Sequence, residues 1–331
     1  MAIRAPRIKR IVPQTGVEGG KIWIEGTGFD PEELASTLIT FGGRAARPFL
    51  LSNTRILVPI PEDASPGPLV VSVKGKRSPE YAFQSALRLS NEVNPVDSPA
   101  FDREGNLYVG YSGKRGETPP VSVFKISPEG VVAPHLSNVP NATSLAFGPD
   151  GDLYVSSRFE GTVYRCTPNA DAKVFARDLG TPTGLAVDAD GYLFVGDRAG
   201  RILRVSPKGE PRVFAEIPES TIAFHLVLDH DGNLIVSNPG LSSNNQILMV
   251  DRFGKVTSLY RGFGRPQGMA VDAEGNLYVC DAKVGESMVL RISRDGEMTP
   301  VVSGPVMVGI ALDGKGNAAV VSQSSVYRIT L

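Results

Sequence analysis

The side chains that most often do chemistry in proteins are few in this sequence and far apart. The chain has three histidines and two cysteines in 331 residues. His225 and His230 span an expected strand and its turn, so they would not face one metal ion. Cys166 and Cys280 lie in different parts of the chain and predict neither a disulfide framework nor a zinc site. We therefore expect these residues, and His135, to be packed or at the surface.

The standard catalytic and nucleotide-binding motifs are absent from the sequence. It contains no G-x-S-x-G elbow, H-E-x-x-H pair, P-loop or G-x-G-x-x-G turn. The Asp-x-Asp-Gly segments at 188–191 and 229–232 could suggest calcium. An EF-hand loop also needs further oxygen ligands and a Glu at its twelfth position, which these segments lack. Because a similar turn recurs throughout the chain, we interpret them as Asx-type turns of hairpins.

These turns belong to a phrase that recurs six times: a turn residue, two variable residues, Gly, and a short apolar or aromatic strand. The third copy predicts four antiparallel strands between Gly184 and Ala215, with a turn at 188–191. Four strands in a repeat of about 40 residues are typical of one propeller blade. We therefore predict an all-β fold with a six-bladed β-propeller. The recurring glycines are Gly105, Gly151, Gly191, Gly232, Gly275 and Gly316.

The last repeat lacks one strand. The chain stops after Ser325-Val-Tyr-Arg-Ile-Thr-Leu331, while the alternating segment Ala86-Leu-Arg-Leu-Ser90 precedes the first repeat. We predict that residues about 86–90 complete the sixth blade, so that residues 86–331 form a closed ring with no free inner edge.

The repeats resemble NHL-repeat propellers and, more loosely, the six-bladed SMP-30/gluconolactonase-like group. The resemblance covers about residues 92–331 and implies the fold more strongly than any function. The segments that carry it are Pro182-Thr-Gly-Leu-Ala-Val-Asp188, Gly191-Tyr-Leu-Phe-Val-Gly-Asp197, Gly200-Arg-Ile-Leu-Arg204, Pro266-Gln-Gly-Met-Ala-Val-Asp272 and Gly275-Asn-Leu-Tyr-Val-Cys-Asp281.

Residues 1–85 differ in kind. Short alternating segments such as Lys21-Ile-Trp-Ile-Glu25 and Leu69-Val-Val-Ser-Val73 are separated by Gly/Pro turns, which predicts a β-sandwich. The opening P-x-x-G-x-x-G-G at 13–20, the turn at 26–29 and Phe41-Gly-Gly43 resemble an IPT/TIG domain, which implies an immunoglobulin-like fold. Almost no linker follows, so we expect a fixed orientation between the two parts.

Candidate binding residues come from aligning the repeats, because the start of each innermost strand faces the central channel of a propeller. The position five residues before the first turn residue is Asp97 in the first repeat, and His225 breaks the pattern beside Phe224 in the fourth. Two longer polar loops, 238–246 and 283–287, could add a rim site. The candidates for the axial channel and rim are Asp97, Asn141, Thr143, Thr183, Phe224, His225, Asn238 and Gln267.

The resemblance to SMP-30-like enzymes implies a divalent cation at the axis, held by Glu, Asn and Asp. Here Asp97 stands where the first carboxylate falls, but Thr183 replaces the Asn and Gln267 the Asp. One carboxylate with Thr and Gln is a poor set of ligands for such an ion. We therefore expect no cofactor, with a divalent cation such as calcium as the alternative.

Composition narrows the classes of function. A net charge of −1 gives no reason to expect nucleic acid as a partner, and no apolar run predicts membrane insertion. No signal peptide is recognisable, which favours the cytoplasm by default, or an extracytoplasmic location if a leader was removed. Three readings stay open: a non-enzymatic module for a protein, small-molecule or carbohydrate ligand; a metal-dependent lactonase-type hydrolase; and a structural subunit of an assembly. We favour the first.

Overall fold

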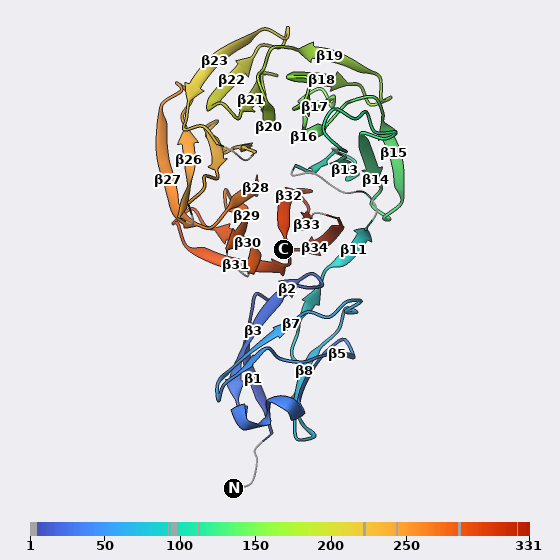
Figure 1. Cartoon of the computed structure of the whole chain (residues 1–331), viewed down its shortest axis with the longest axis vertical. Helices are drawn as coiled ribbons and strands as arrows, with labels where there is room; N and C mark the ends of the chain where they lie inside the picture. The colour runs from blue at the N-terminus through green and yellow to red at the C-terminus, as the bar shows by residue number, and fades with distance from the viewer. Residues whose placement is uncertain are drawn as a thin grey trace.

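Two architectures make up the chain, a ring of six sheets and a pair of smaller sheets beside it (Figure 1). The computed structural model describes residues 5–91, 93, 98–111, 113–220, 223–242, 244–283, 286–322 and 324–331. The predicted all-β fold, an immunoglobulin-like sandwich plus a six-bladed propeller, is confirmed. Asp97 lies outside the described residues.

The sandwich buries the apolar residues of its alternating strands between two sheets. In β3, Ile22 and Ile24 are fully buried, while Trp23 points to the opposite face and stays half-buried. Phe41 and Phe83 meet edge to face in the core, 5.2 Å apart between ring centroids. The first sheet comprises β1 (Arg7–Val12), β3 (Lys21–Thr27), β7 (Arg55–Pro59) and β6 (Leu50–Leu51); the second comprises β5 (Arg44–Ala46), β4 (Thr37–Phe41), β8 (Leu69–Val73) and β9 (Lys76–Arg77), and the 3-10 helix η1 (Pro31–Ser36) precedes β4.

Blades one to four are each a four-stranded antiparallel sheet in chain order. Blade five has the same four strands with further strands added at its outer edge, and blade six has three strands of the repeat. Blades one to three are β12 (Ala100–Phe101), β13 (Leu107–Gly110), β14 (Val123–Ile126), β15 (Val132–Leu136); β16 (Ala142–Phe147), β17 (Leu153–Ser157), β18 (Thr162–Cys166), β19 (Ala172–Ala176); and β20 (Pro182–Val187), β21 (Leu193–Asp197), β22 (Arg201–Val205), β23 (Pro211–Glu216). Blades four to six are β24 (His225–Leu228), β25 (Leu234–Asn238), β26 (Asn245–Val250), β27 (Val256–Phe263); β28 (Pro266–Val271), β29 (Leu277–Lys283), β30 (Glu286–Ile292), β31 (Met298–Gly304); and β32 (Met307–Leu312), β33 (Asn317–Ser322), β34 (Val326–Thr330).

The acidic residues of the recurring phrase hold the turns between the first and second strands. Asp272 accepts the backbone N–H of Asn276 at 2.8 Å and its side-chain amide at 2.7 Å. Asp102, Asp229 and Asp313 make the same two bonds to the Asn four residues later. Gly275 has a φ of 83° in this turn, a left-handed conformation that is unfavourable for a residue with a Cβ. The prediction of Asx-type turns is confirmed for these carboxylates.

The ring closes as predicted. Strand β11 (Leu87–Ser90) pairs antiparallel with β34, where Leu87 lies opposite Arg328 and Ser90 opposite Val326. Figure 1 shows β11 leaving the sandwich and passing beside β34 at the rim of the ring. The sixth blade therefore consists of β32, β33, β34 and β11, the strand that precedes the first blade in the sequence.

The sandwich also adds strands to the fifth blade. Strand β2 (Thr15–Gly16) pairs parallel with β31, and β10 (Gln84–Ser85) pairs parallel with β2. The result is one six-stranded sheet in the order β10-β2-β31-β30-β29-β28. These hydrogen bonds join the two parts of the chain through one continuous sheet.

The segment around β2 packs closely against β31, because Gly16 and Gly20 have no side chain in the contact. A Cβ on Gly20 would lie 2.6 Å from the Ser303 carbonyl oxygen. Val17, which directly follows β2, is buried in the same apolar cluster as Val302 and Met307. At the edge of this contact, Glu18 accepts hydrogen bonds from the hydroxyl of Tyr327 at 3.1 Å and from Arg88 at 2.6 Å. The glycines of the opening motif thus serve the docking of the sandwich on blade five.

Candidate functional site

The axial candidates of the second repeat bind the propeller's own backbone. Asn141 is 1% exposed and has a φ of 48°. Its side chain accepts the N–H of Gly116 at 2.8 Å and donates to the carbonyl of Lys114 at 3.0 Å. Thr143, also 1% exposed, donates its hydroxyl to the carbonyl of Asn141 at 2.9 Å. These two residues hold the long loop of blade one against the start of blade two.

The candidates of the third and fourth repeats connect neighbouring blades. The hydroxyl of Thr183 accepts the backbone N–H of Phe224 at 3.0 Å and donates to the carbonyl of Gly196 at 3.3 Å. Phe224 is fully buried in the apolar cluster between blades three and four. His225 begins β24 and is 2% exposed, and its backbone N–H donates to the hydroxyl of Ser237 at 3.2 Å.

Asn238 belongs to a set of polar residues that end the second strand of a blade and hold the segment before its first strand. Asn238 donates to the carbonyl of Pro218 at 3.3 Å. At the same place in blade three, Asp197 accepts the N–H of Thr181 at 2.8 Å, and in blade five, Asp281 accepts the N–H of Arg265 at 2.8 Å. Asp281 is 1% exposed, and this burial raises the pKa of its carboxyl despite the hydrogen bonds it accepts.

Gln267 is the exception among the described candidates. Its side chain is 6% exposed, yet its amide has no hydrogen-bond partner in the part of the chain that the structure describes. It lines a hollow of about 580 Å³ between the sandwich and blade five. We call this hollow the Trp23 cleft, after the half-buried indole that lines it from β3.

The polar groups of the Trp23 cleft come mostly from five strands, β3, β28, β29, β30 and β31. Besides Gln267 on β28, they include Ser287 on β30, Ser303 on β31 and Lys21 on β3, with Arg265, Lys283 and Glu286 at the exposed edge. The ammonium group of Lys21 also lies 5.8 Å from the centroid of the Phe49 ring. The sequence singled out Gln267 and loop 283–287, which includes Ser287, but did not single out Lys21 or Ser303. The alternation of β3, which turns Lys21 and Trp23 away from the core, was the available signal.

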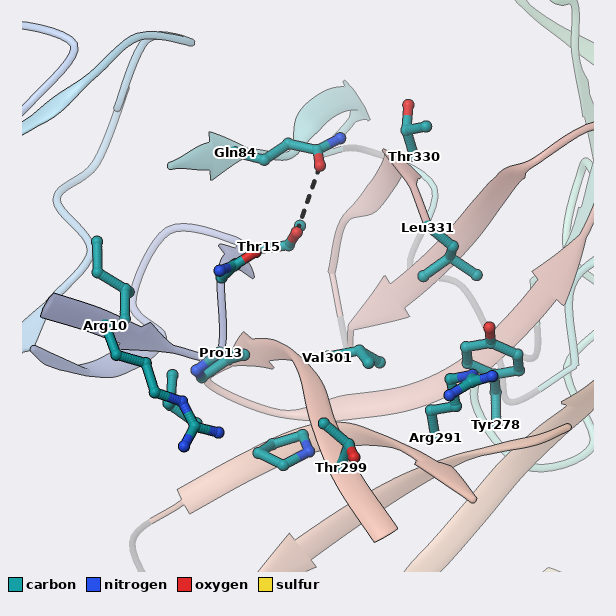
Figure 2. Close-up of a pocket in the computed structure, with 14 residues that line it drawn as sticks. Arg10, Pro13, Thr15, Gln84, Tyr278, Arg291, Thr299, Val301, Thr330 and Leu331 are labelled. Atoms are coloured by element: carbon teal, nitrogen blue, oxygen red, sulfur yellow. Dashed lines mark hydrogen bonds between the residues drawn. The ribbon is translucent and has the colours of Figure 1, made fainter. Parts of the chain in front are cut away.

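A second hollow lies at the other ends of the same strands (Figure 2). We call it the Arg291 cleft; it measures about 450 Å³, and Pro13 and Pro300 line both clefts and so separate them. Several of its polar groups already have partners within the protein: Thr15 donates a hydrogen bond of 3.4 Å to Gln84, and the Tyr278 phenol interacts with the neighbouring Asp272 and Arg291. Burial raises the pKa of the Tyr278 phenol, as does the neighbouring Asp272.

A third hollow, of about 660 Å³, lies at the turn end of blades one and two. His135 lines it and packs edge to face on Tyr108, with 4.8 Å between ring centroids. Burial lowers the pKa of His135, and the charge of Lys125 lowers it further. The carboxylate of Asp102 in this hollow is engaged in an Asx turn with Asn106.

The described residues do not form the ligand set that the SMP-30-like resemblance implies. The described part of the chain has no group of three or more His, Cys, Asp or Glu side chains placed to hold a metal ion. Thr183 is engaged with backbone groups of Phe224 and Gly196, and Gln267 faces the Trp23 cleft with a neutral amide. Within the described residues, the donors therefore do not fit a divalent cation.

A search for membrane-spanning helices among the described residues finds none of sufficient length and apolarity.

Two family models match the chain. The IPT/TIG domain matches residues 6–86, and the SMP-30/Gluconolactonase/LRE-like region matches residues 91–237. No curated protein matches the sequence.

Solved structures share the fold at low sequence identity. An auxiliary nutrient binding protein from Bacteroides thetaiotaomicron is 13% identical, with a TM-score of 0.59 over 98% of this chain and 97% of that one. A gluconolactonase from Xanthomonas campestris is 16% identical, with a TM-score of 0.64 over 74% of this chain and 89% of that one. A virginiamycin B lyase from Staphylococcus aureus is 14% identical, with a TM-score of 0.55 over 99% and 95%. The chain thus carries an IPT/TIG domain followed by an SMP-30/gluconolactonase-like β-propeller region.

Proposed function

We propose that the protein is a non-enzymatic binding protein, in which residues 1–85 form a sandwich domain rigidly attached to a propeller domain of residues 86–331. One observation carries this proposal: the described axial side chains Asn141, Thr143 and Thr183 are hydrogen-bonded to the propeller's own backbone. Such side chains position strands and loops, and they leave no described acid–base pair at the axis. The similarity to an auxiliary nutrient binding protein along nearly the whole chain supports the same reading.

A lactonase-type hydrolase is the second candidate. The family match over residues 91–237 favours it, as does the similarity to a gluconolactonase. Its divalent cation would require Asp97 and oxygen ligands from neighbouring blades. The neutral Thr183 and Gln267 weigh against that reaction.

Metal titration and a lactone assay separate the two candidates. The protein and an Asp97→Ala variant are titrated calorimetrically with Ca²⁺, Zn²⁺ and Mn²⁺, and hydrolysis of D-glucono-1,5-lactone is followed with each ion. We expect no tight metal binding and no hydrolysis above the uncatalysed rate. Tight binding and turnover that both disappear in Asp97→Ala would overturn the proposal in favour of the hydrolase.

A further inference from the structure

We propose that the Trp23 cleft binds a small organic anion, a carboxylate attached to a ring, with the ring on Trp23 and the carboxylate near Gln267. This inference rests on the proposed binding function and adds the site and the chemical class of the ligand. Both parts of the chain contribute: Lys21 and Trp23 come from the sandwich, and Gln267 and Lys283 from blade five. The cleft exists only because β2 docks on β31.

Gln267 is the first indication of a ligand. Only 6% of the residue is exposed, and no described group of the protein binds its amide. The amide atoms are not fully enclosed, so their partners must be water or a ligand rather than the protein. Since Gln267 lines the cleft, an occupant of the cleft can supply that partner.

Two buried hydroxyls that line the same cleft favour an acceptor as the ligand group. The hydroxyl oxygen of Ser303 accepts the backbone N–H of Lys21 at 2.8 Å, and that of Ser287 accepts the N–H of Met307 at 2.9 Å. Neither hydroxyl donates its own hydrogen to a described group. Each has one O–H left to give, and the Gln267 amide has two N–H donors. A carboxylate, which is an acceptor only, can receive such bonds.

The charges around the cleft favour an anion. Lys21, Arg265 and Lys283 line it, against the single carboxylate of Glu286. The other carboxylate near Lys283 is that of Asp281, which is 1% exposed and faces the backbone N–H groups of Gly264 and Arg265. Hydrogen bonds that involve a charged group are stronger than neutral ones, so an anion gains more from this lining than a neutral ligand does.

Trp23 and the size of the cleft favour a ring. The indole is half-buried on the outer face of β3 and offers a flat apolar surface to the cleft. The volume of about 580 Å³ lies within the range of small-molecule pockets. A bare inorganic anion would leave the indole uncovered, so the ring is part of the proposal.

Trp23 is also the reporter, because it is the only tryptophan in the chain. The full-length protein is titrated with D-glucuronate, D-galacturonate and benzoate, and the tryptophan emission is followed. D-Glucose and inorganic phosphate are the matched neutral ring and ring-free anion. We expect a saturable change with at least one ring carboxylate and none with glucose or phosphate; the sugar acids and benzoate tell a carbohydrate source from an aromatic one.

The variant Gln267→Leu tests the amide, and Gln246→Leu on β26 of blade four is the control. Because a hydrogen bond to a charged group is lost, we expect Gln267→Leu to weaken binding by at least about tenfold, while its melting temperature is not lowered. Gln246→Leu should bind as the unmodified protein does, since Gln246 does not line the cleft.

Two sets of results would overturn the inference. The first is an emission that no ring carboxylate changes, or that glucose or phosphate changes as strongly. The second is equal binding by Gln267→Leu and Gln246→Leu. Neither result touches the proposed function, which falls only if the protein hydrolyses the lactone in an Asp97-dependent way.

Discussion

Gly20 of the sandwich and Ser303 of blade five approach so closely that a Cβ on Gly20 would lie 2.6 Å from the Ser303 carbonyl oxygen. No side chain fits between them without moving one of the two parts. The next residue, Lys21, donates its N–H to the Ser303 hydroxyl at 2.8 Å, so the same short segment both requires a glycine and binds the partner strand.

Gly20→Ala should therefore loosen the docking of the sandwich. Overpacking a close contact costs about 1–3 kcal/mol, and the φ of Gly20 is not in the left-handed region, so the loss would come from the contact itself. Urea unfolding measures the loss, and a shift in Trp23 emission reports the cleft. Gly240→Ala is the control, since its Cβ would lie no closer than 3.3 Å to any atom, the nearest being Oδ1 of Asn245. Equal stability of the two variants would contradict this account.

Closure of the ring by β11 can be separated from docking of the sandwich. A fragment of residues 86–331 keeps β11 but loses β2 and β10, and a fragment of residues 92–331 also loses β11. We expect the second fragment to melt at a clearly lower temperature, because β34 is then left as an open edge. Differential scanning calorimetry compares the two. Identical melting would show that β11 does not hold the ring together.

Asn141 should protect the loop of blade one from proteolysis. Its side chain binds the backbone of Lys114 and Gly116, on either side of Arg115. We expect Asn141→Ala to speed tryptic cleavage after Lys114 and Arg115, measured by mass spectrometry. Asn138→Ala is the matched control, because Asn138 also has a left-handed φ, 65°, but is exposed and makes no described side-chain bond to this loop. Equal cleavage in both variants would mean that backbone strain, and not the amide, protects the loop.

We predict that the buried carboxyl of Asp281 makes the free energy of unfolding depend on pH. Its burial raises the pKa of the folded-state carboxyl above the ordinary value of 3.8. Between the two values the folded state binds more protons than the unfolded state, so the free energy of unfolding should fall as the pH rises through this window. Asp281→Asn should remove that slope while keeping one oxygen for the N–H of Arg265. Urea unfolding from pH 4 to pH 6 measures both proteins, and an unchanged slope in the variant would assign it to other groups.

The sequence repeat allowed the ring to be predicted. The contact between the sandwich and blade five could not be predicted in the same way. Strand β11 could be found because counting strands left the last repeat one short, and Ala86–Ser90 had the pattern to fill the gap. Strands β2 and β10 have two residues each, too few for a period, and their pairing depends on where the sandwich docks. Parallel pairing between distant segments leaves no local signature.

The candidate site shows the same limit. Aligning the repeats drew attention to Gln267, because the alignment marks the start of each inner strand. It could not show that the sandwich forms a cleft over this position, since Lys21 and Trp23 lie more than half the chain away in sequence. Nor could it show that Asn141 and Thr183 already have backbone partners, because those depend on loops outside the repeat.

The six-stranded sheet limits how the sandwich of such a protein can be exchanged for that of another. Domains joined by a linker can be exchanged as cassettes, because the joint makes few demands on either side. Here the joint is part of a blade: a transplanted sandwich would have to carry Gly16, Gly20 and β10, and the receiving propeller would need a free outer strand equivalent to β31. The two parts are thus expected to be inherited and to diverge as one unit, with the Trp23 cleft as the surface that both would shape together.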